Sequence, residues 1–253
     1  MDNHTKQLSK KRFKKSWTLK RIALTGLVSL LLLVTLLFGA FLIYASDYYR
    51  ADPEALAVLD RPEGVVVSKN FTLLRAIPPS DIGIIFYPGG KVESTAYLPM
   101  LDQLSRQGIH VILVDMPFNF AFLDSNAANR AFELVPEVKY WYISGHSLGG
   151  AMASNYASKN PEKVEGLILL GAYIYGDFPP SRTLTVYGTF NDNLEKFINY
   201  TENVVIIDGG NHAQFGNYGK QAGDPDATIS ALEQQQQAID AILNFVGRIG
   251  AGQ

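Results

Sequence analysis

The sequence contains no cysteine, and this absence excludes several classes of protein. A chain without thiols has no disulfide framework, no thiolate metal site and no cysteine nucleophile. A chain of 253 residues does not need such cross-links, because it buries enough surface to form a stable core. The absence leaves the compartment open, although a cysteine-free chain tolerates an oxidising exterior.

A second absence is local, because residues 22–45 carry no charged side chain. As an α-helix, this segment would reach roughly 36 Å, enough to cross a hydrocarbon core of about 30 Å. The preceding residues, 1–21, contain eight basic side chains and one acidic side chain. The positive-inside rule therefore predicts a single-pass signal anchor in the cell membrane, with a cytoplasmic N-terminus and everything after residue 45 outside.

A cleaved signal peptide is the alternative interpretation of the same segment. Its apolar stretch is usually about 7 to 15 residues long and ends at a small-x-small cleavage site. The segment here is longer, and Tyr44 occupies a position where a small residue is expected. A retained anchor is therefore the preferred prediction.

Positive charge is scarce in the rest of the chain. Residues 46–253 contain 14 basic and 23 acidic side chains, a net charge of −9. Nucleic-acid binding is not expected, because neutralising phosphates requires a cationic face. We thus predict a basic cytoplasmic tail at 1–21, a transmembrane anchor at 22–45, a connector at 46–64 and one folded domain at 65–253.

The folded domain alternates between short β-branched runs and longer amphipathic stretches, which predicts an α/β fold with a mostly parallel, doubly wound sheet. The predicted strands cover residues 65–67, 71–77, 82–87, 109–114, 140–143, 164–170, 183–187 and 204–207. The predicted helices cover residues 94–107, with Ser94 as N-cap, 126–134, 148–159, 193–200 and 228–246. Ligands of such sheets bind at the carboxyl ends of the strands.

A candidate nucleophile follows the strand at 140–143. The sequence Gly145-His146-Ser147-Leu148-Gly149-Gly150 lies between this strand and the helix at 148–159. A G-x-S-x-G pattern in that context is typical of a strained turn that exposes the serine hydroxyl above a helix N-terminus. The alternative is that Ser147 only caps the helix.

A serine hydroxyl needs a base that removes its proton, and the chain has four histidines. His4 belongs to the basic tail, His110 begins a strand, and His146 points elsewhere because it directly precedes Ser147. His212 follows the last predicted strand, from which a base can reach back over the serine. We therefore predict that His212 is the general base.

The third member of a triad is an acid that orients the histidine. Asp192 follows the strand at 183–187, and the order Ser147, Asp192, His212 matches one known triad arrangement. Asp177 is the chief competitor, and Asp208 is a weaker one because it lies close to His212 in sequence. Asp192 also fits a purely structural role as a cap of the helix at 193–200.

A developing oxyanion needs preorganised N–H donors. The backbone of Leu148, directly after the nucleophile, is the first expected donor. The second is expected from the loop after the strand at 82–87, where Pro88 has no N–H. Gly90 or Lys91 is therefore the predicted second donor.

Residues 82–246 resemble the α/β-hydrolase superfamily. The resemblance is carried by Tyr87-Pro88-Gly89-Gly90, the Gly145–Gly150 turn, residues 188–192 and Gly209-Gly210-Asn211-His212. Residues 209–219 resemble small lidless bacterial esterases near the dienelactone hydrolases. The resemblance implies an α/β-hydrolase domain with a Ser-His-Asp triad and an acyl-ester substrate, and neither a metal nor a cofactor is expected.

Two positions depart from the family pattern. Many relatives have His-Gly where this chain has Pro88-Gly89, which leaves the second oxyanion donor open. Many also place the acid three residues after the strand-end glycine, where this chain has Asn191, one residue before Asp192. The segment 171–182 is too short for a helical cap, so an open site is expected.

Aromatic side chains in two neighbouring loops either line an apolar subsite or pack beneath the loops. They are Phe118, Phe120, Phe122, Tyr173, Tyr175 and Phe178. The function expected from all these features is a membrane-anchored, outward-facing serine hydrolase of a carboxylic ester or related acyl bond. The alternatives are a non-catalytic binding module of the same fold and an acyltransferase that uses the same triad.

Overall fold

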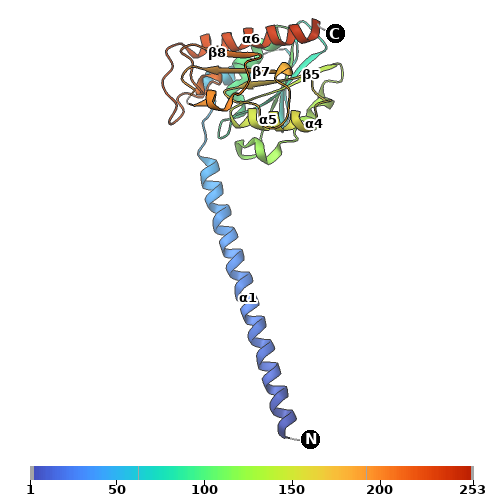
Figure 1. The fold of residues 1–253 in the computed structure, drawn as a ribbon, viewed down its shortest axis with the longest axis vertical. Helices are drawn as coiled ribbons and strands as arrows, with labels where there is room; N and C mark the ends of the chain where they lie inside the picture. Colours follow the sequence, from blue (N-terminus) through green and yellow to red (C-terminus); the bar gives the residue numbers. More distant parts are fainter. Residues whose placement is uncertain (1–2, 62, 192, 252–253) are drawn as a thin grey trace. The chain divides into compact units, whose positions relative to one another are not determined.

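The computed structural model describes residues 3–61, 63–191 and 193–251. It divides the chain into two units, Met1–Asp47 and Tyr48–Gln253. The first unit consists of one helix, α1, over Asn3–Ser46. The second unit contains all the strands (Figure 1).

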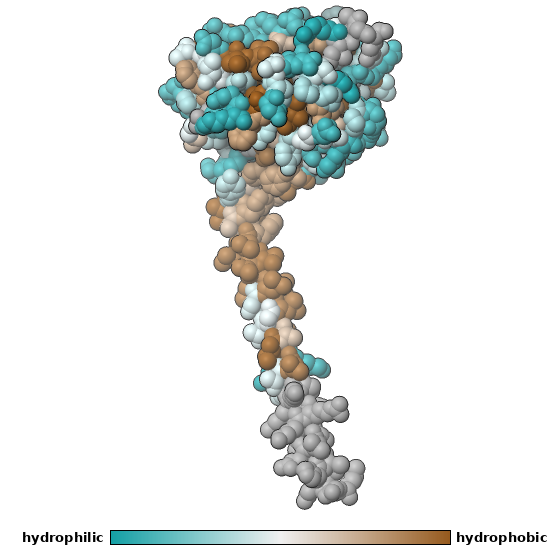
Figure 2. All heavy atoms as spheres, viewed as in Figure 1, coloured by the Kyte–Doolittle hydropathy of each residue, from teal (hydrophilic) through white to brown (hydrophobic). Residues whose placement is uncertain are grey.

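The surface of α1 is apolar over most of its length. The 30 residues Trp17–Ser46 are long and apolar enough to cross a membrane, and no other helix in the described ranges meets this test. Their side chains are largely exposed, and Figure 2 shows this part of the helix mostly in the colours of apolar residues. This surface is consistent with a signal anchor or with a signal peptide.

The second unit is built on one eight-stranded sheet with the order β1-β2-β4-β3-β5-β6-β7-β8. β1 pairs with β2, and β2 with β4, in antiparallel fashion, and the remaining neighbours are parallel. The predicted α/β fold with a mostly parallel sheet is therefore confirmed. The strands are β1 Val65–Val67, β2 Phe71–Leu74, β3 Ile82–Tyr87, β4 His110–Val114, β5 Tyr140–His146, β6 Gly166–Leu170, β7 Thr183–Gly188 and β8 Val204–Ile207.

Helices cover both faces of this sheet, as the continuous apolar runs of the central strands require. On one face, α3 (Leu98–Arg106) and α6 (Ala231–Ala251) contribute to one buried apolar cluster. On the other face, α4 (Ala128–Ala131) and α5 (Leu148–Lys159) contribute to a second cluster (Figure 1). A further short helix, α2, spans Pro53–Ala57.

Eight short 3₁₀ helices occur in the connections of the described ranges. They are η1 Val58–Asp60, η2 Ser94–Tyr97, η3 Pro117–Asn119, η4 Ala121–Asp124, η5 Phe132–Leu134, η6 Pro180–Arg182, η7 Leu194–Phe197 and η8 Ala213–Phe215. Two predicted helices, 126–134 and 193–200, are therefore shorter and partly or wholly 3₁₀ in character. Tight 3₁₀ turns are common at helix ends and in connectors.

The predicted N-cap role of Ser94 is wrong. Its hydroxyl donates a hydrogen bond to the carboxylate of Asp115, and the chain forms η2 before α3 begins at Leu98. Pro99 lies in the first turn of α3, where a missing N–H costs nothing because that donor has no partner within the helix. The helix therefore begins four residues later than predicted.

Candidate active site

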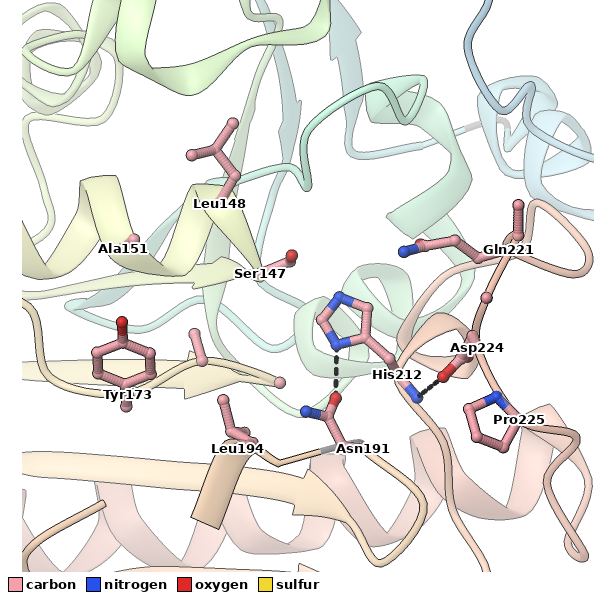
Figure 3. Close-up of a pocket in the computed structure, with 14 residues that line it drawn as sticks. Ser147, Leu148, Ala151, Tyr173, Asn191, Leu194, His212, Gln221, Asp224 and Pro225 are labelled. Atoms are coloured by element: carbon pink, nitrogen blue, oxygen red, sulfur yellow. Dashed lines mark hydrogen bonds between the residues drawn. The ribbon is translucent and has the colours of Figure 1, made fainter. Parts of the chain in front are cut away.

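Ser147 lies at the sharp turn between β5 and α5. Its φ and ψ angles are +52° and −121°, and its backbone N–H donates to the carbonyl of Leu170 at 3.0 Å. A non-glycine residue in this region carries backbone strain of about 1–3 kcal/mol, which the surrounding structure must support. The turn lifts the side chain of Ser147 into a pocket at the carboxyl edge of the sheet (Figure 3).

Two glycines make this turn possible by allowing close backbone contacts. A Cβ atom on Gly145 would lie 2.5 Å from the carbonyl carbon of Gly149. A Cβ atom on Gly149 would lie 2.2 Å from the carbonyl oxygen of Tyr87 at the end of β3. Any side chain at either position would separate the strand from the helix, so the pattern G-x-S-x-G has a direct steric cause here.

His212 lies in the loop between β8 and η8 and lines the same pocket as Ser147. Its Nδ1 atom is 2.5 Å from Oδ1 of Asn191, which is 6% exposed. The amide oxygen only accepts, so Nδ1 carries the proton and Nε2 has a free lone pair. Figure 3 shows the Nε2 edge of the ring turned toward Ser147.

Of the three candidate acids, Asp192 lies outside the described residues. Asp177 and Asp208 are both exposed and do not line the pocket. The side chain that bonds to His212 is Asn191, which stands where many relatives have their acid. The sequence carried a signal for it, since it is the third residue after Gly188.

Asp224 is a carboxylate close to His212 that the sequence analysis missed. It lines the pocket, and its two oxygens accept hydrogen bonds from the backbone N–H groups of His212 at 3.1 Å and Ala213 at 2.7 Å. Burial lowers the pKa of His212, and the negative charge of Asp224 opposes this effect. The imidazole is therefore kept neutral and has a carboxylate nearby that favours its protonated form.

A chain of buried hydrogen bonds supports His212 from below. Nε2 of His146 lies 2.9 Å from the His212 carbonyl oxygen, which only accepts, so this nitrogen carries the proton. Nδ1 of His146 therefore accepts from the hydroxyl of Tyr97 at 2.8 Å, and the Tyr97 oxygen accepts from the N–H of Gly89 at 3.1 Å. Both rings are almost fully buried.

The buried surroundings of His146 and its neighbour His212 hold His146 in its neutral form. Burial lowers its pKa well below the usual value, and the positive charge of a protonated His212 acts in the same direction. The two imidazole rings lie 4.6 Å apart between centroids. His146 does not line the pocket, but its ring lies against that of His212, the predicted base.

The predicted oxyanion donors lie at the start of α5, for Leu148, and on the loop after β3, for Gly90 and Lys91. A Cβ atom on Gly90 would lie 2.8 Å from the side chain of Leu148, so this loop and the start of α5 are in close contact. The backbone N–H of Lys91 donates to the carbonyl of Asn119 at 2.9 Å and is directed to that partner. Of the two predicted alternatives, Gly90 thus fits the role better than Lys91.

The pocket above Ser147 has a volume of about 470 Å³ and mostly apolar walls. It is lined by Ser147, Leu148, Ala151, Gly171, Ala172, Tyr173, Asn191, Leu194, His212, Gln221, Ala222, Gly223, Asp224 and Pro225. No cluster of three or more histidine, aspartate or glutamate side chains that could bind a metal ion occurs in the described ranges.

The aromatic side chains expected near the site divide into three kinds. Tyr173 lines the pocket and its ring stacks on that of Phe197 at 5.0 Å. Phe120 and Phe178 are buried and pack under the loops. The remaining three are exposed outside the pocket lining: Phe118, Phe122 and Tyr175.

Comparison with known proteins identifies the class that this fold and site define. Residues 83–237 match the model of the alpha/beta hydrolase family. This match covers more than half of the chain, and the protein therefore belongs to that family. A search of curated proteins found no match.

Solved structures share the fold at low sequence identity. The crystal structure of a protein described as a putative lipase, from Acinetobacter baumannii, has a TM-score of 0.55 and 13% identity over 80% of this chain and 98% of its own. A monoglyceride lipase from Saccharomyces cerevisiae has a TM-score of 0.53 and 10% identity over 73% and 94%. Est1E from Butyrivibrio proteoclasticus has a TM-score of 0.52 and 13% identity over 73% and 100%.

Proposed function

We propose that the protein is a serine hydrolase that cleaves a carboxylic ester or a related acyl bond through an acyl-enzyme. The observation that carries this proposal is the arrangement of Ser147 and His212. The serine lies on a strained turn in the pocket, and the imidazole is held by Asn191 with its free nitrogen toward the serine. This arrangement supports the assignment of Ser147 as the nucleophile and His212 as its general base.

The proposed reaction has two halves. Nε2 of His212 takes the Ser147 proton while Oγ attacks the substrate carbonyl, and the N–H groups of Leu148 and Gly90 stabilise the oxyanion. The protonated imidazole then gives its proton to the leaving alcohol, which departs and leaves an acyl-serine. His212 then takes a proton from water as the water oxygen attacks the acyl carbon. The bond from the acyl carbon to Oγ breaks, the carboxylic acid leaves, and the imidazole returns the proton to Ser147.

Orientation of the base is assigned to Asn191, because its amide oxygen holds the Nδ1 proton. An amide fixes the tautomer but contributes no full negative charge to the protonated imidazole. The negative charge of Asp224 favours the protonated imidazole instead. The sequence-based prediction that Asp192 is the acid stays a prediction, and the variant Asp192→Asn tests it by the loss of activity it causes.

The substrate is proposed to be a small, uncharged acyl ester. The walls of the pocket are mostly apolar, and Asp224 lines it, so an anionic group beside His212 would be repelled. Two of the structures that share the fold are described as lipases, and the third is Est1E. Their likeness to this chain is one of fold, and it is compatible with an ester substrate.

We further propose that α1 is a retained signal anchor with a cytoplasmic N-terminus. Its apolar surface and the basic residues before it support this orientation. Because the chain has no cysteine, single cysteines can report the topology. Ser181→Cys should react with a membrane-impermeant maleimide on intact cells, whereas Ser9→Cys should react only after lysis; the reverse pattern would refute the orientation.

The direct test of the activity is a panel of p-nitrophenyl esters of increasing chain length, with the full chain in detergent. We expect hydrolysis of short and medium acyl chains by the native protein. We expect a loss of at least about 10³-fold in Ser147→Ala and in His212→Ala. Equal hydrolysis by the native protein and Ser147→Ala would refute the proposal.

A non-catalytic binding module is the second candidate, and one observation favours it. The residue that orients His212 is an amide where many relatives have an acid. In that case Ser147→Ala would leave the cellular phenotype of the native gene unchanged. An acyltransferase is distinguished from a hydrolase by product analysis, since added alcohols would then become the main acyl acceptors.

A further inference from the structure

The segment Tyr48–Asp52, which follows α1 in the sequence, is bonded to two loops of the site. The backbone N–H of Tyr49 donates to the carbonyl of Lys91 at 2.8 Å, and its carbonyl accepts from the N–H of Glu93 at 2.9 Å. These two bonds form a short parallel bridge beside Val92. The first loop is therefore the one that holds Gly90.

The second loop contains the pocket wall at residues 221–225. The phenol oxygen of Tyr49 accepts a hydrogen bond from the N–H of Ala222 at 2.8 Å. The Tyr49 ring also lies 5.7 Å from the ring of Tyr218. Three residues further along, the N–H of Asp52 donates to the carbonyl of Asn217 at 2.9 Å.

The far end of this wall holds the base. Asp224 follows Ala222 by two residues, and its carboxylate binds the backbone N–H groups of His212 and Ala213. Its own N–H donates to the carbonyl of Gln221 at 3.1 Å, which closes the wall into a tight turn. Hydrogen bonds and the backbone of the turn thus link Tyr49 to His212.

We propose that residues 221–225 form a clasp, and that Tyr49 and Asp224 are positioning residues that hold His212 through it. This proposal rests on the proposed function, because it assigns a purpose to the placement of the base. The hydroxyl of Tyr49 fixes one end of the clasp and the carboxylate of Asp224 fixes the peptide of the base. The segment that follows the apolar helix is therefore a working part of the site.

The test compares Tyr49→Phe with Tyr48→Phe in the full chain. The first variant removes only the hydroxyl that accepts from Ala222, and it keeps the ring against Tyr218. The second removes a neighbouring hydroxyl whose ring contacts Arg50 and so is a matched control. We expect Tyr49→Phe to lower kcat for p-nitrophenyl butyrate about fivefold with KM unchanged, as the loss of one hydrogen bond allows.

A double-mutant cycle with Asp224→Asn tests whether the two residues act through one path. If they do, the combined variant will lose less activity than the product of the two single losses. Fully independent losses would contradict the clasp. A rise in KM alone, or a fall in thermal stability alone, with kcat unchanged, would also contradict a positioning role.

Hydrogen exchange gives a readout that does not require activity. We expect faster exchange of the amides of His212 and Ala213 in both Tyr49→Phe and Asp224→Asn. In Tyr48→Phe, the exchange rates of these amides should equal those of the native protein. Faster exchange confined to residues 48–52 would overturn the clasp. If the native protein shows no esterase activity while exchange still spreads to His212, the proposed function fails and the clasp remains.

Discussion

The turn at Ser147 and the loop at His212 hold their side chains by different means. Ser147 is placed by its own backbone, because glycines on either side let β5, α5 and β3 approach within contact distance. His212 is placed by side chains from distant segments: Asn191, Asp224 and His146. A short local sequence therefore determines the first position, whereas the second depends on the whole assembled fold.

The largest effect is expected where this local packing is broken. In Gly149→Ala, the new Cβ would lie 2.2 Å from the Tyr87 carbonyl oxygen, so the helix must move away from the strand. We expect a loss of more than about 3 kcal/mol in the free energy of unfolding. Thermal unfolding measures it, and Gly247→Ala is the matched control.

Gly247 lies in α6 with no atom within 4 Å of the added Cβ. Its replacement by alanine should leave stability unchanged or raise it by up to about 1 kcal/mol, because alanine favours helix. Equal melting temperatures for the two variants would show that the turn tolerates a side chain and would refute the steric account of the pattern.

A smaller effect, on catalysis and of opposite sign, is expected at Asn191, which bonds to His212. Asn191→Asp places a carboxylate against the Nδ1 proton of His212, and this charge-assisted hydrogen bond is stronger than the one from an amide. We expect kcat/KM to rise about tenfold in Asn191→Asp and to fall about tenfold in Asn191→Ala. Ester hydrolysis measures both.

The control for this pair is Asn193→Asp, an exposed position two residues along the same loop. It adds the same charge but should leave kcat/KM unchanged. If Asn191→Asp behaves like this control while Asp192→Asn loses most of the activity, the orienting role belongs to Asp192.

The pH dependence should report the charge near His212. The proposed base, His212, acts in its neutral form, and burial lowers its pKa, so activity should persist to pH values below the ordinary titration range of histidine. Asp224 raises that pKa, and His146, the other titratable group against the ring, stays neutral. Asp224→Asn should therefore move the acidic limb of kcat/KM to still lower pH.

The matched control is Asp226→Asn, an exposed carboxylate that pairs with Lys220. Its acidic limb should coincide with that of the native protein at moderate ionic strength, because water and salt screen an exposed charge. A limb that moves to higher pH in Asp224→Asn would contradict the assigned sign.

The smallest effect is expected in the buried hydrogen bonds that join Gly89, Tyr97 and His146. Tyr97→Phe removes the hydroxyl that joins Gly89 to His146 and should lower stability by about 1 kcal/mol and kcat by a few-fold. The control is Tyr142→Phe. The Tyr142 hydroxyl makes only a long hydrogen bond, of 3.5 Å, to the carbonyl of Val246 in α6. Identical rates in the two variants would show that the buried chain does not support the base.

The same contrast explains what the sequence could predict. The strands β1, β3 and β8 and the helix α5 begin and end as predicted, because buried apolar runs and the glycine turn are local features. The fold class followed from their alternation. The short α3 did not, because the contact of Ser94 with Asp115 joins segments that are adjacent only after the sheet forms.

The candidate site divides in the same way. Ser147 and His212 could be selected from their places after β5 and β8, and both line one pocket. The partner of His212 could not be chosen between neighbouring residues, because the direction of each side chain depends on the turn after β7. Asp224 and Tyr49 carried no sequence signal, since their roles arise from contacts across long separations.

Covalent labelling tests directly whether His212 activates Ser147. The full chain is treated with a fluorophosphonate probe, its intact mass is measured and the modified peptide is sequenced. The account predicts one adduct per chain, on Ser147, with labelling strongly slowed in His212→Ala and absent in Ser147→Ala. An unmodified native protein, or an adduct on another residue, would contradict it.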